Sequence, residues 1–371
     1  MNPTGQGEAR GAPAKRRAER VVVAMSGGVD SSLAAALVVE RGFEAIGITM
    51  NLAGGTSRCC SLADADDARR VAEKLGIRFY VANYREQFHR EVIEAFADEY
   101  LRGRTPIPCV TCNSRFKFDY LRERAEVLGA RRVATGHYAR IDFDPEGGRY
   151  RLRRALDQSK DQSYFLFELN QRQLASTWFP LGEMTKASVR ERARTLGLQT
   201  AEKPESQELC FVPDGDYAAL VERLRPEAAQ RTGDFVDASG RVLGRHRGVH
   251  HYTVGQRRGL GISAAKPLYV RAIDPQSGRV VLGEARELHA RGADLEAVSW
   301  LAGTPPQGPL RAEVQVRHRH RPVRASIEAR GERRARVHFD EPVRAIAPGQ
   351  AAVFYRADEV LGGGWIARSL G

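Results

Sequence analysis

Long hydrophobic runs are missing from this sequence of 371 residues. No apolar stretch approaches the roughly 20 residues that a membrane-spanning helix needs, and the N-terminal residues contain no signal-peptide core. Hydrophobic residues make up 42% of the chain and aromatic residues 8%, as is typical of a globular protein. We therefore expect a cytoplasmic protein that does not bind a membrane. The length exceeds that of one ordinary core and predicts two or three domains.

Cysteine is scarce, with five residues that all fall within the first 210 positions. In a cytosolic chain this pattern favours reactive or metal-binding thiols over structural disulfides. Cys109 and Cys112 form a C-x-x-C pair, a spacing that serves redox pairs, zinc and iron–sulfur clusters alike. A zinc ribbon would need a second C-x-x-C, and the sequence has none. Because the preceding segment 105–108 contains two prolines, which disfavour a helix, we expect both thiols on an ordered loop.

The adjacent pair Cys59 and Cys60 is less informative. Only Arg58 stands nearby to lower the pKa of a thiol, so two small buried residues explain this pair equally well. Its role stays open.

The segment from Val21 to Glu40 contains no lysine, yet it has the other features of a phosphate-binding loop. The apolar run 21–24 predicts a strand buried on both faces, and glycines at 27 and 28 allow a tight turn that brings N–H groups close to a ligand. The helical pattern that follows directs a helix N-terminus at the same point, which favours an anion. Because a Walker loop needs a lysine for the β- and γ-phosphates, chemistry at the γ-phosphate is not favoured.

This loop resembles the loop of the ATP pyrophosphatases, which cleave ATP between the α- and β-phosphates, activate an oxygen by adenylation and release pyrophosphate. The resemblance implies that the loop holds the departing pyrophosphate and that Asp30 lies near its Mg²⁺.

The pattern of elements predicts an α/β fold. Apolar runs at 45–50, 79–81 and 133–135 alternate with helical patterns at 64–75 and 88–100, which is typical of a parallel sheet covered by helices. After about Ser206 the pattern changes to short alternating strands and Gly-rich turns, which predict a small β domain and then a β-barrel. The expected parts are a disordered basic tail (1–20), a parallel-sheet ATP-pyrophosphatase domain of the adenine nucleotide alpha hydrolase-like type (21–205), a small central β-rich domain (206–285) and a C-terminal β-barrel domain (286–371).

The charge of the chain favours a polyanionic partner. Lysine and arginine outnumber aspartate and glutamate by 58 to 46, which gives a net charge of +12. The segment 317–321 reads Arg-His-Arg-His-Arg and follows the alternating pattern 313–316. Cations crowded at the end of a strand repel each other unless a phosphate chain lies beside them.

Several motifs together carry a specific resemblance to a known family. In chain order they are Ser26–Ser32, Thr105–Asn113 with Lys117 and Phe118, Ala134–Tyr138, Ser159–Leu166, Glu208–Phe211, Gly255–Gly261, Asp340–Pro342 and Pro348–Gln350. In this order the motifs resemble those of the tRNA-specific 2-thiouridylases, and the resemblance covers all but the N-terminal tail. That family makes 2-thiouridine at the wobble position of certain tRNAs.

The resemblance implies roles for particular residues. Cys112 and Cys210 are the catalytic pair, with Cys112 as nucleophile and Cys210 as carrier of a persulfide. The residues implied in ATP binding are Ala24, Met25, Ser26, Gly27, Gly28, Val29, Asp30, Ser31, Met50 and Gly136. The residues implied in tRNA binding are Ile107, Pro108, Cys109, Lys160, Asp161, Gln162, Arg317 and His318.

The chemistry of the base agrees with these roles. The C2 oxygen of uracil is a poor leaving group, so ATP must convert it into an adenylate before sulfur can displace it as AMP. The persulfide of Cys210 delivers sulfur directly, or as hydrosulfide after attack by the Cys112 thiolate, and a disulfide then remains to be reduced. The target base must also leave the anticodon stack. The expected partners are tRNA and a sulfur donor, either a cysteine desulfurase or a sulfur-relay protein.

Two positions depart from many members of the family. Ile107 stands where many have asparagine, so a base contact can be carried over only through its backbone. Position 109 is cysteine where some members have aspartate, and Cys109, Cys112 and Cys210 could together hold a [4Fe–4S] cluster with one iron open for a sulfide. The sequence identifies no other metal ligand with certainty.

Two further classes of function stay open. Another adenylating enzyme, such as an amidotransferase-type synthetase or a tRNA-lysidine synthetase, would need no cysteine pair. A non-catalytic RNA-binding protein would need no pyrophosphate loop. The presence of both features favours the thiouridylase.

Overall fold

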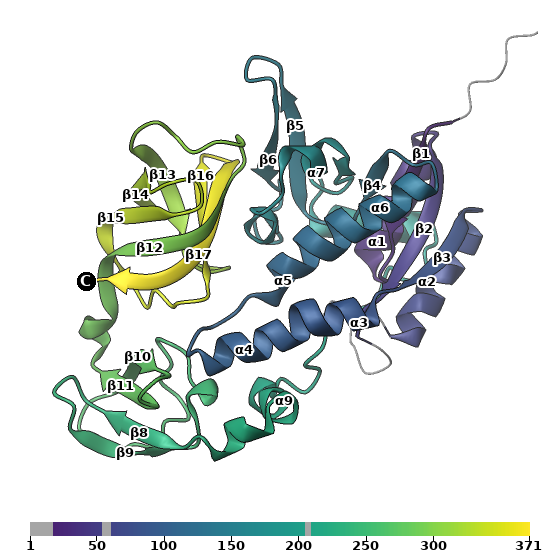
Figure 1. Cartoon of the computed structure of the whole chain (residues 1–371). Helices are drawn as coiled ribbons and strands as arrows, with labels where there is room; N and C mark the ends of the chain where they lie inside the picture. The colour runs from purple at the N-terminus through teal and green to yellow at the C-terminus, as the bar shows by residue number, and fades with distance from the viewer. Residues whose placement is uncertain (1–17, 54–60, 205–208) are drawn as a thin grey trace, which may run out of the picture.

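The computed structural model describes residues 18–53, 61–204 and 209–371 (Figure 1). Cys59, Cys60 and Glu208 lie outside these residues, as do the first 17 residues of the expected tail. No helix among the described residues is long and apolar enough to cross a membrane.

A five-stranded parallel sheet forms the N-terminal part. Its order is β3-β2-β1-β4-β7, and all neighbouring strands run parallel. The strands are β1 (Arg20–Ala24), β2 (Glu44–Asn51), β3 (Arg78–Asn83), β4 (Arg132–Ala134) and β7 (Thr177–Trp178). In the central strand β1, Val21 and Val23 face one hydrophobic core and Val22 faces the other. The apolar run thus forms a strand buried on both faces, as predicted.

Helices cover both faces of this sheet (Figure 1). One core is closed by α1 (Val29–Glu40), α2 (Leu62–Lys74) and α8 (Lys186–Thr195). The other core receives side chains from two long helical segments that lie side by side. The first consists of α3 (Arg85–Phe88), the π-helical η1 (His89–Glu94) and α4 (Ala95–Leu101); the second consists of α5 (Pro108–Thr111), the π-helical η2 (Cys112–Tyr120) and α6 (Leu121–Val127).

The prediction that the C-x-x-C thiols lie on a loop is wrong. Cys109 lies in α5 and Cys112 is the first residue of η2. Pro108 occupies the first position of α5, where the missing N–H of proline leaves no helical hydrogen bond unmade and its fixed φ suits the helix. The prolines therefore set where the helix begins.

A β-hairpin of the N-terminal part joins it to the C-terminal barrel. Strands β5 (Ala139–Asp144) and β6 (Arg149–Arg154) pair with each other, and β6 also pairs with β17 (Glu359–Leu370). Two short helices follow the hairpin, η3 (Ser163–Leu166) and α7 (Gln171–Ala175).

The middle part begins with α9 (Tyr217–Leu224) and η4 (Pro226–Gln230) and contains a four-stranded sheet of order β10-β11-β8-β9. The strands are β8 (Gly233–Val236), β9 (Val242–His246), β10 (Tyr269–Asp274) and β11 (Arg279–Gly283), with the short helix η5 (Val249–His251) after β9. Phe235, Tyr252 and Val270 are buried at its centre.

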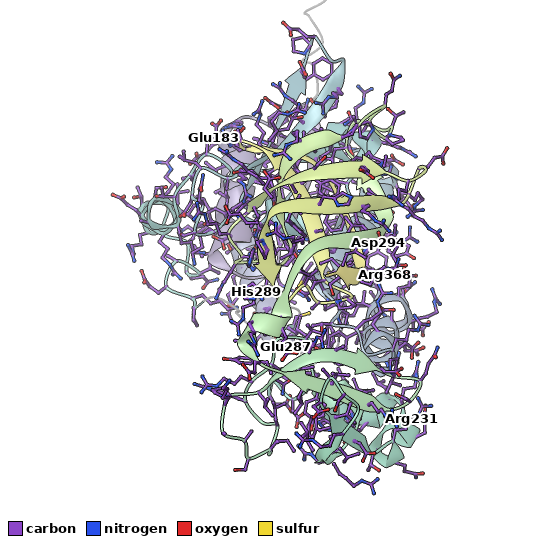
Figure 2. The ribbon with its side chains drawn as sticks, turned by 90° about the vertical axis from the view of Figure 1, so that its left-hand side faces the viewer. Glu183, Arg231, Glu287, His289, Asp294 and Arg368 are labelled. Atoms are coloured by element: carbon purple, nitrogen blue, oxygen red, sulfur yellow. The ribbon has the colours of Figure 1, made fainter. Side chains whose placement is uncertain are left out.

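The C-terminal part is a closed barrel that follows η6 (Ala285–Leu288). Its strands are β12 (His289–Trp300), β13 (Leu310–Gln315), β14 (Val323–Ala329), β15 (Ala335–Arg344), β16 (Ala351–Arg356) and β17. Pairing of β12 with both β15 and β17 closes the sheet, which removes its edges. Asp294 of β12 accepts hydrogen bonds from Arg336 on β15 and from Arg368 on β17, so one carboxylate ties both sides of the closure (Figure 2). The predicted fold class is confirmed.

Candidate active site

The turn between β1 and α1 forms the proposed phosphate-binding loop. Gly27 has a φ of +70°, and a Cβ there would collide with the backbone carbonyl of Asp64, so only glycine fits. A Cβ at Gly136 would come within 2.7 Å of the backbone nitrogen of Ser31. The Ser31 hydroxyl accepts a hydrogen bond from the Ser26 N–H at 3.1 Å and donates to the Gly28 carbonyl at 3.0 Å. Ser31 therefore shapes the loop, and Gly136 lets the β4 edge approach it closely.

The carboxylate of Asp30 has two partners from distant parts of the chain. Lys186 Nζ donates to both Oδ1 and Oδ2 at 2.8 Å, and the Tyr138 hydroxyl donates to Oδ1 at 2.8 Å. The sequence predictions did not include Lys186. It is the first residue of α8, where a cation opposes the helix dipole, and this unfavourable position is a signal that could have identified it.

Beside the loop lies a cavity of about 440 Å³. Most of the predicted site residues line it: Ala24, Met25, Ser26, Gly28, Val29, Asp30, Ser31, Met50, Pro108, Cys109, Cys112, Gly136, Lys160, Gln162 and Cys210. Gly27, Ile107, Asp161, Arg317 and His318 are not among its lining residues. Thus the cavity brings together the loop, the C-x-x-C thiols and the thiol of Cys210.

The two proposed catalytic cysteines share one hydrophobic environment. Cys112 and Cys210 are both partly buried and pack against the same core, which contains Phe88 and Phe116. Cys109 is the more exposed thiol. Lys203 donates to Asp64 at 2.7 Å and to Asp67 at 2.6 Å, both on α2.

A buried histidine forms part of the cavity wall. His137 Nδ1 lies 2.7 Å from the Thr135 hydroxyl, and its Nε2 lies 3.3 Å from Lys117 Nζ and 3.2 Å from Asn113 Oδ1. Burial, assisted by the Lys117 charge, lowers the pKa of His137 well below its ordinary value. The ring is therefore neutral at pH 7 and can hold the Lys117 ammonium at the cavity without a second positive charge.

The predicted tRNA-contact segment 160–162 divides between the cavity and the interior. Asp161 is buried and accepts from the Ala155 N–H at 2.9 Å and from the Ser163 hydroxyl at 2.7 Å. Its side chain therefore anchors the segment internally. Lys160 and Gln162 line the cavity, and Gln162 Oε1 accepts from the Tyr138 N–H at 2.9 Å.

The predicted barrel contacts lie next to the cavity wall. The His318 ring packs on Phe165, a lining residue, with 4.4 Å between ring centroids. Burial lowers the pKa of His318. Arg317 and Arg319 on either side are exposed, just beyond the end of β13. His318 thus supports the wall, while the two arginines face solvent.

A second cavity, of about 540 Å³, lies between α4 and the barrel. Ile107, Glu168 and Trp365 line it, and Pro108 lines both cavities. Ile107 therefore lines a different cavity from the one beside the phosphate-binding loop.

Family models match the chain in three successive segments. They are described as a tRNA methyl transferase HUP domain (residues 19–214), a tRNA methyl transferase PRC-barrel domain (222–284) and an aminomethyltransferase beta-barrel domain (291–366).

Curated relatives match over nearly the whole length. The chain is 50% identical to the tRNA-specific 2-thiouridylase MnmA of Solibacter usitatus (strain Ellin6076), over 93% of this chain and 98% of the relative. It is 51% identical to the protein of that name from Geobacter metallireducens, over 94% and 96% of the two chains. For the protein of that name from Rhizorhabdus wittichii the identity is 52%, over 99% and 96%.

Proposed function

The chain belongs to the tRNA-specific 2-thiouridylases, and from this premise we propose that it replaces the C2 oxygen of the wobble uridine of tRNA with sulfur, at the expense of ATP. One observation carries the assignment to residues. The phosphate-binding loop, Cys112 and Cys210 line the same cavity of about 440 Å³. An adenylated base and a sulfur-carrying thiol can therefore meet there.

The first step activates the base. The C2 oxygen of uridine attacks the α-phosphorus of ATP, the bond from that phosphorus to the bridging oxygen breaks, and pyrophosphate leaves. The N–H groups of the loop and the N-terminus of α1 stabilise the negative charge on the phosphates. Lys186, which Asp30 holds by two hydrogen bonds, adds a fixed cation beside the loop.

The second step delivers sulfur. A sulfur donor, such as a cysteine desulfurase or a sulfur-relay protein, loads Cys210 with a sulfane sulfur to give a persulfide. The Cys112 thiolate attacks the Sγ of Cys210, a disulfide forms between the two residues, and hydrosulfide is released. Hydrosulfide attacks C2 and AMP leaves with the former C2 oxygen. The sulfane sulfur has been reduced and the two thiols oxidised, so a thiol reductant must restore the enzyme.

Mg²⁺ is expected to enter with the phosphates of ATP. Both oxygens of Asp30 accept hydrogen bonds from Lys186 in the present arrangement, so the ammonium is the main partner of this carboxylate. We therefore assign Asp30 the role of orienting Lys186. Mg²⁺ stays a prediction, with the nucleotide as its principal ligand.

A second route to the same product uses an iron–sulfur cluster held by Cys109, Cys112 and Cys210. The observation that favours it is that Cys109 lines the cavity together with the other two thiols. Such a cluster would supply an iron with an open position for sulfide.

The test compares cysteine variants in anaerobic single-turnover thiolation, with and without iron–sulfur reconstitution, and measures 2-thiouridine by mass spectrometry. Cys112→Ser and Cys210→Ser should each abolish 2-thiouridine, while tRNA-dependent release of pyrophosphate, which precedes sulfur transfer, still occurs. Cys59→Ser is the control and should retain most activity.

Cys109→Ser separates the two routes. A persulfide enzyme should keep substantial activity, whereas a cluster enzyme should lose both activity and bound iron. Full activity of Cys210→Ser in either condition would overturn the sulfur-transfer assignment.

A further inference from the structure

Within residues 18–53, 61–204 and 209–371, one group of three potential metal ligands has its ligand atoms within 4.8 Å of one another: Glu222, His250 and His251. The group lies in the middle part of the chain, where α9 meets η5. His250 Nε2 lies 3.1 Å and His251 Nε2 3.2 Å from the same oxygen, Oε1 of Glu222. Two imidazole nitrogens and a carboxylate oxygen therefore converge on one point.

These separations suit a tetrahedral metal ion. Zinc binds histidine nitrogen and carboxylate oxygen at about 2.0–2.2 Å, so adjacent ligand atoms of a tetrahedral site are about 3.4 Å apart. The two nitrogen–oxygen distances in this group are 3.1 and 3.2 Å, and all three ligand atoms lie within 4.8 Å of one another, so a small outward movement admits the ion. Two histidines with one glutamate form a recurrent zinc ligand set that leaves the fourth position to water.

The local fold holds the His250 ring in this orientation. The ring is fully buried and lies against Gly248, where a Cβ would be 2.8 Å from Nδ1. His250 Nδ1 has no hydrogen-bond partner, so Nε2 makes the polar contact of this ring. An ion bound at Nε2 would add its binding free energy to the stability of the folded chain.

The other two ligands are accessible. His251 and Glu222 are partly exposed, which leaves a path for an ion from solvent.

We propose that Glu222, His250 and His251 bind a divalent transition-metal ion of the zinc type, which fastens α9 to η5. The Tyr217 hydroxyl of α9 already donates to the His251 carbonyl at 3.4 Å, and the Tyr217 ring stacks on Tyr100 of α4 at 4.6 Å between centroids. The ion therefore stiffens the joint between α9, the first helix after Cys210, and the rest of the middle part. The site is structural and does not depend on the thiolation chemistry.

The experiment measures Zn²⁺ binding to the full-length chain without a polyhistidine tag, by competition with a chromophoric chelator. Because active-site thiolates also bind zinc, the parent protein carries Cys109→Ser, Cys112→Ser and Cys210→Ser. We expect one Zn²⁺ per chain, and Co²⁺ in its place should give the strong visible absorption of a four-coordinate ion. Glu222→Gln and His251→Ala should each weaken binding at least about tenfold, since even outer-shell substitutions weaken metal binding by about that much.

The matched control is His289→Ala, which removes an exposed histidine at the start of the barrel and should bind zinc like the parent (Figure 2). Zinc should raise the melting temperature of the parent and the control but not of the two ligand variants, because only a ligand of the native state stabilises it. Failure of the parent to bind zinc, or equal affinity in all four proteins, would overturn the proposal. Circular dichroism of the zinc-free variants shows that each is folded when it is compared.

Discussion

Ion pairs in the parallel-sheet part and in the barrel have different surroundings. Asp30 and Lys186 lie at the wall of a cavity, and the Lys186 side chain is 12% exposed. Asp294 and its two arginines lie on the outside of the barrel, where Arg368 is 68% exposed. The cavity pair joins the first turns of two helices, α1 and α8, whereas the barrel group joins neighbouring strands in register.

The difference follows from the two kinds of sheet. In a parallel sheet the carboxyl ends of the strands meet at one edge, so polar residues after each strand gather above a common crevice. A closed antiparallel barrel directs charged side chains outward along its strands, and cross-strand pairs hold the register. The same pairing of charges thus lies at the wall of a cavity in one part and across the closure of the barrel in the other.

The largest effect should come from the cavity pair. Lys186→Met removes the ammonium but keeps most of the side-chain volume, and tRNA-dependent formation of AMP should fall about 100-fold or more, as for other fixed charges at a transition state. Asp30→Asn should have a similar effect, and the double variant should be little worse than either single one. The control is Lys266→Met, which removes an exposed lysine paired with Glu284 at 3.0 Å. A normal rate in Lys186→Met would show that the pair is only structural.

The second effect concerns stability and pH. The pKa of His137 is lowered in the folded chain, so the unfolded chain binds a proton first as the pH falls. The free energy of unfolding should therefore decrease below about pH 6.5, the ordinary pKa of histidine. His137→Asn should cost about 1–3 kcal/mol at pH 8, because partners of the ring lose their hydrogen bonds. Urea unfolding of the parent and of His137→Asn at pH 8 and pH 5.5 measures the difference between their free energies of unfolding. This difference should shrink at pH 5.5. An equal loss of stability in both proteins between the two pH values would show that His137 is not the group responsible.

The third effect concerns the exposed arginines of the barrel. Arg317→Ala combined with Arg319→Ala should weaken tRNA binding about tenfold and reduce the slope of log K against log salt, to which each phosphate contact contributes about −0.9 or less. ATP affinity should not change. The matched control is Arg311→Ala on β13, because Arg311 already pairs with Asp340. If both proteins show the same slope as the parent, Arg317 and Arg319 contact no phosphate.

The smallest effect should come from the barrel closure. Arg336 and Arg368 hold the pKa of Asp294 at about 2, so this carboxylate contributes stability above pH 4 that is lost as the pH falls towards 2. Because Arg368 is largely exposed, solvent screens the pair, and Asp294→Asn should cost only about 1 kcal/mol at pH 7. Denaturant unfolding measures this loss in the free energy of unfolding, and the thiolation activity of Asp294→Asn should be unchanged. A loss of thiolation activity without a loss of stability would show that the Asp294 group has a role in the reaction, contrary to this prediction.

Local patterns predicted the elements well. The run at 45–50 lies within β2, and the helical pattern at 64–75 overlaps α2 almost completely. Such patterns report which faces are buried, and burial decides most strands and helices. The exception is the C-x-x-C segment, because the same proline that cannot continue a helix is well suited to begin one.

Partners in the site were harder to predict. Lys186 lies 156 residues from Asp30 in sequence, so no local pattern connects them. Asp161 belongs to a predicted contact segment, yet its carboxylate turns inward to hold the backbone of Ala155. Whether a polar side chain faces a ligand or the interior depends on what packs around it, which a motif does not describe.

The sequence by itself determined the three-part order of the chain, the strand–loop–helix with its glycine turn and the family to which the motifs belong. These properties depend on hydrophobic period, on glycine at a backbone angle of +70° and on short strings of residues, all of which are local. Only the tertiary structure decided that Cys112 and Cys210 line one cavity, that Lys186 holds Asp30 and that Glu222 meets His250 and His251. Those contacts join segments that are far apart in sequence, and their distances follow from the packing of whole elements.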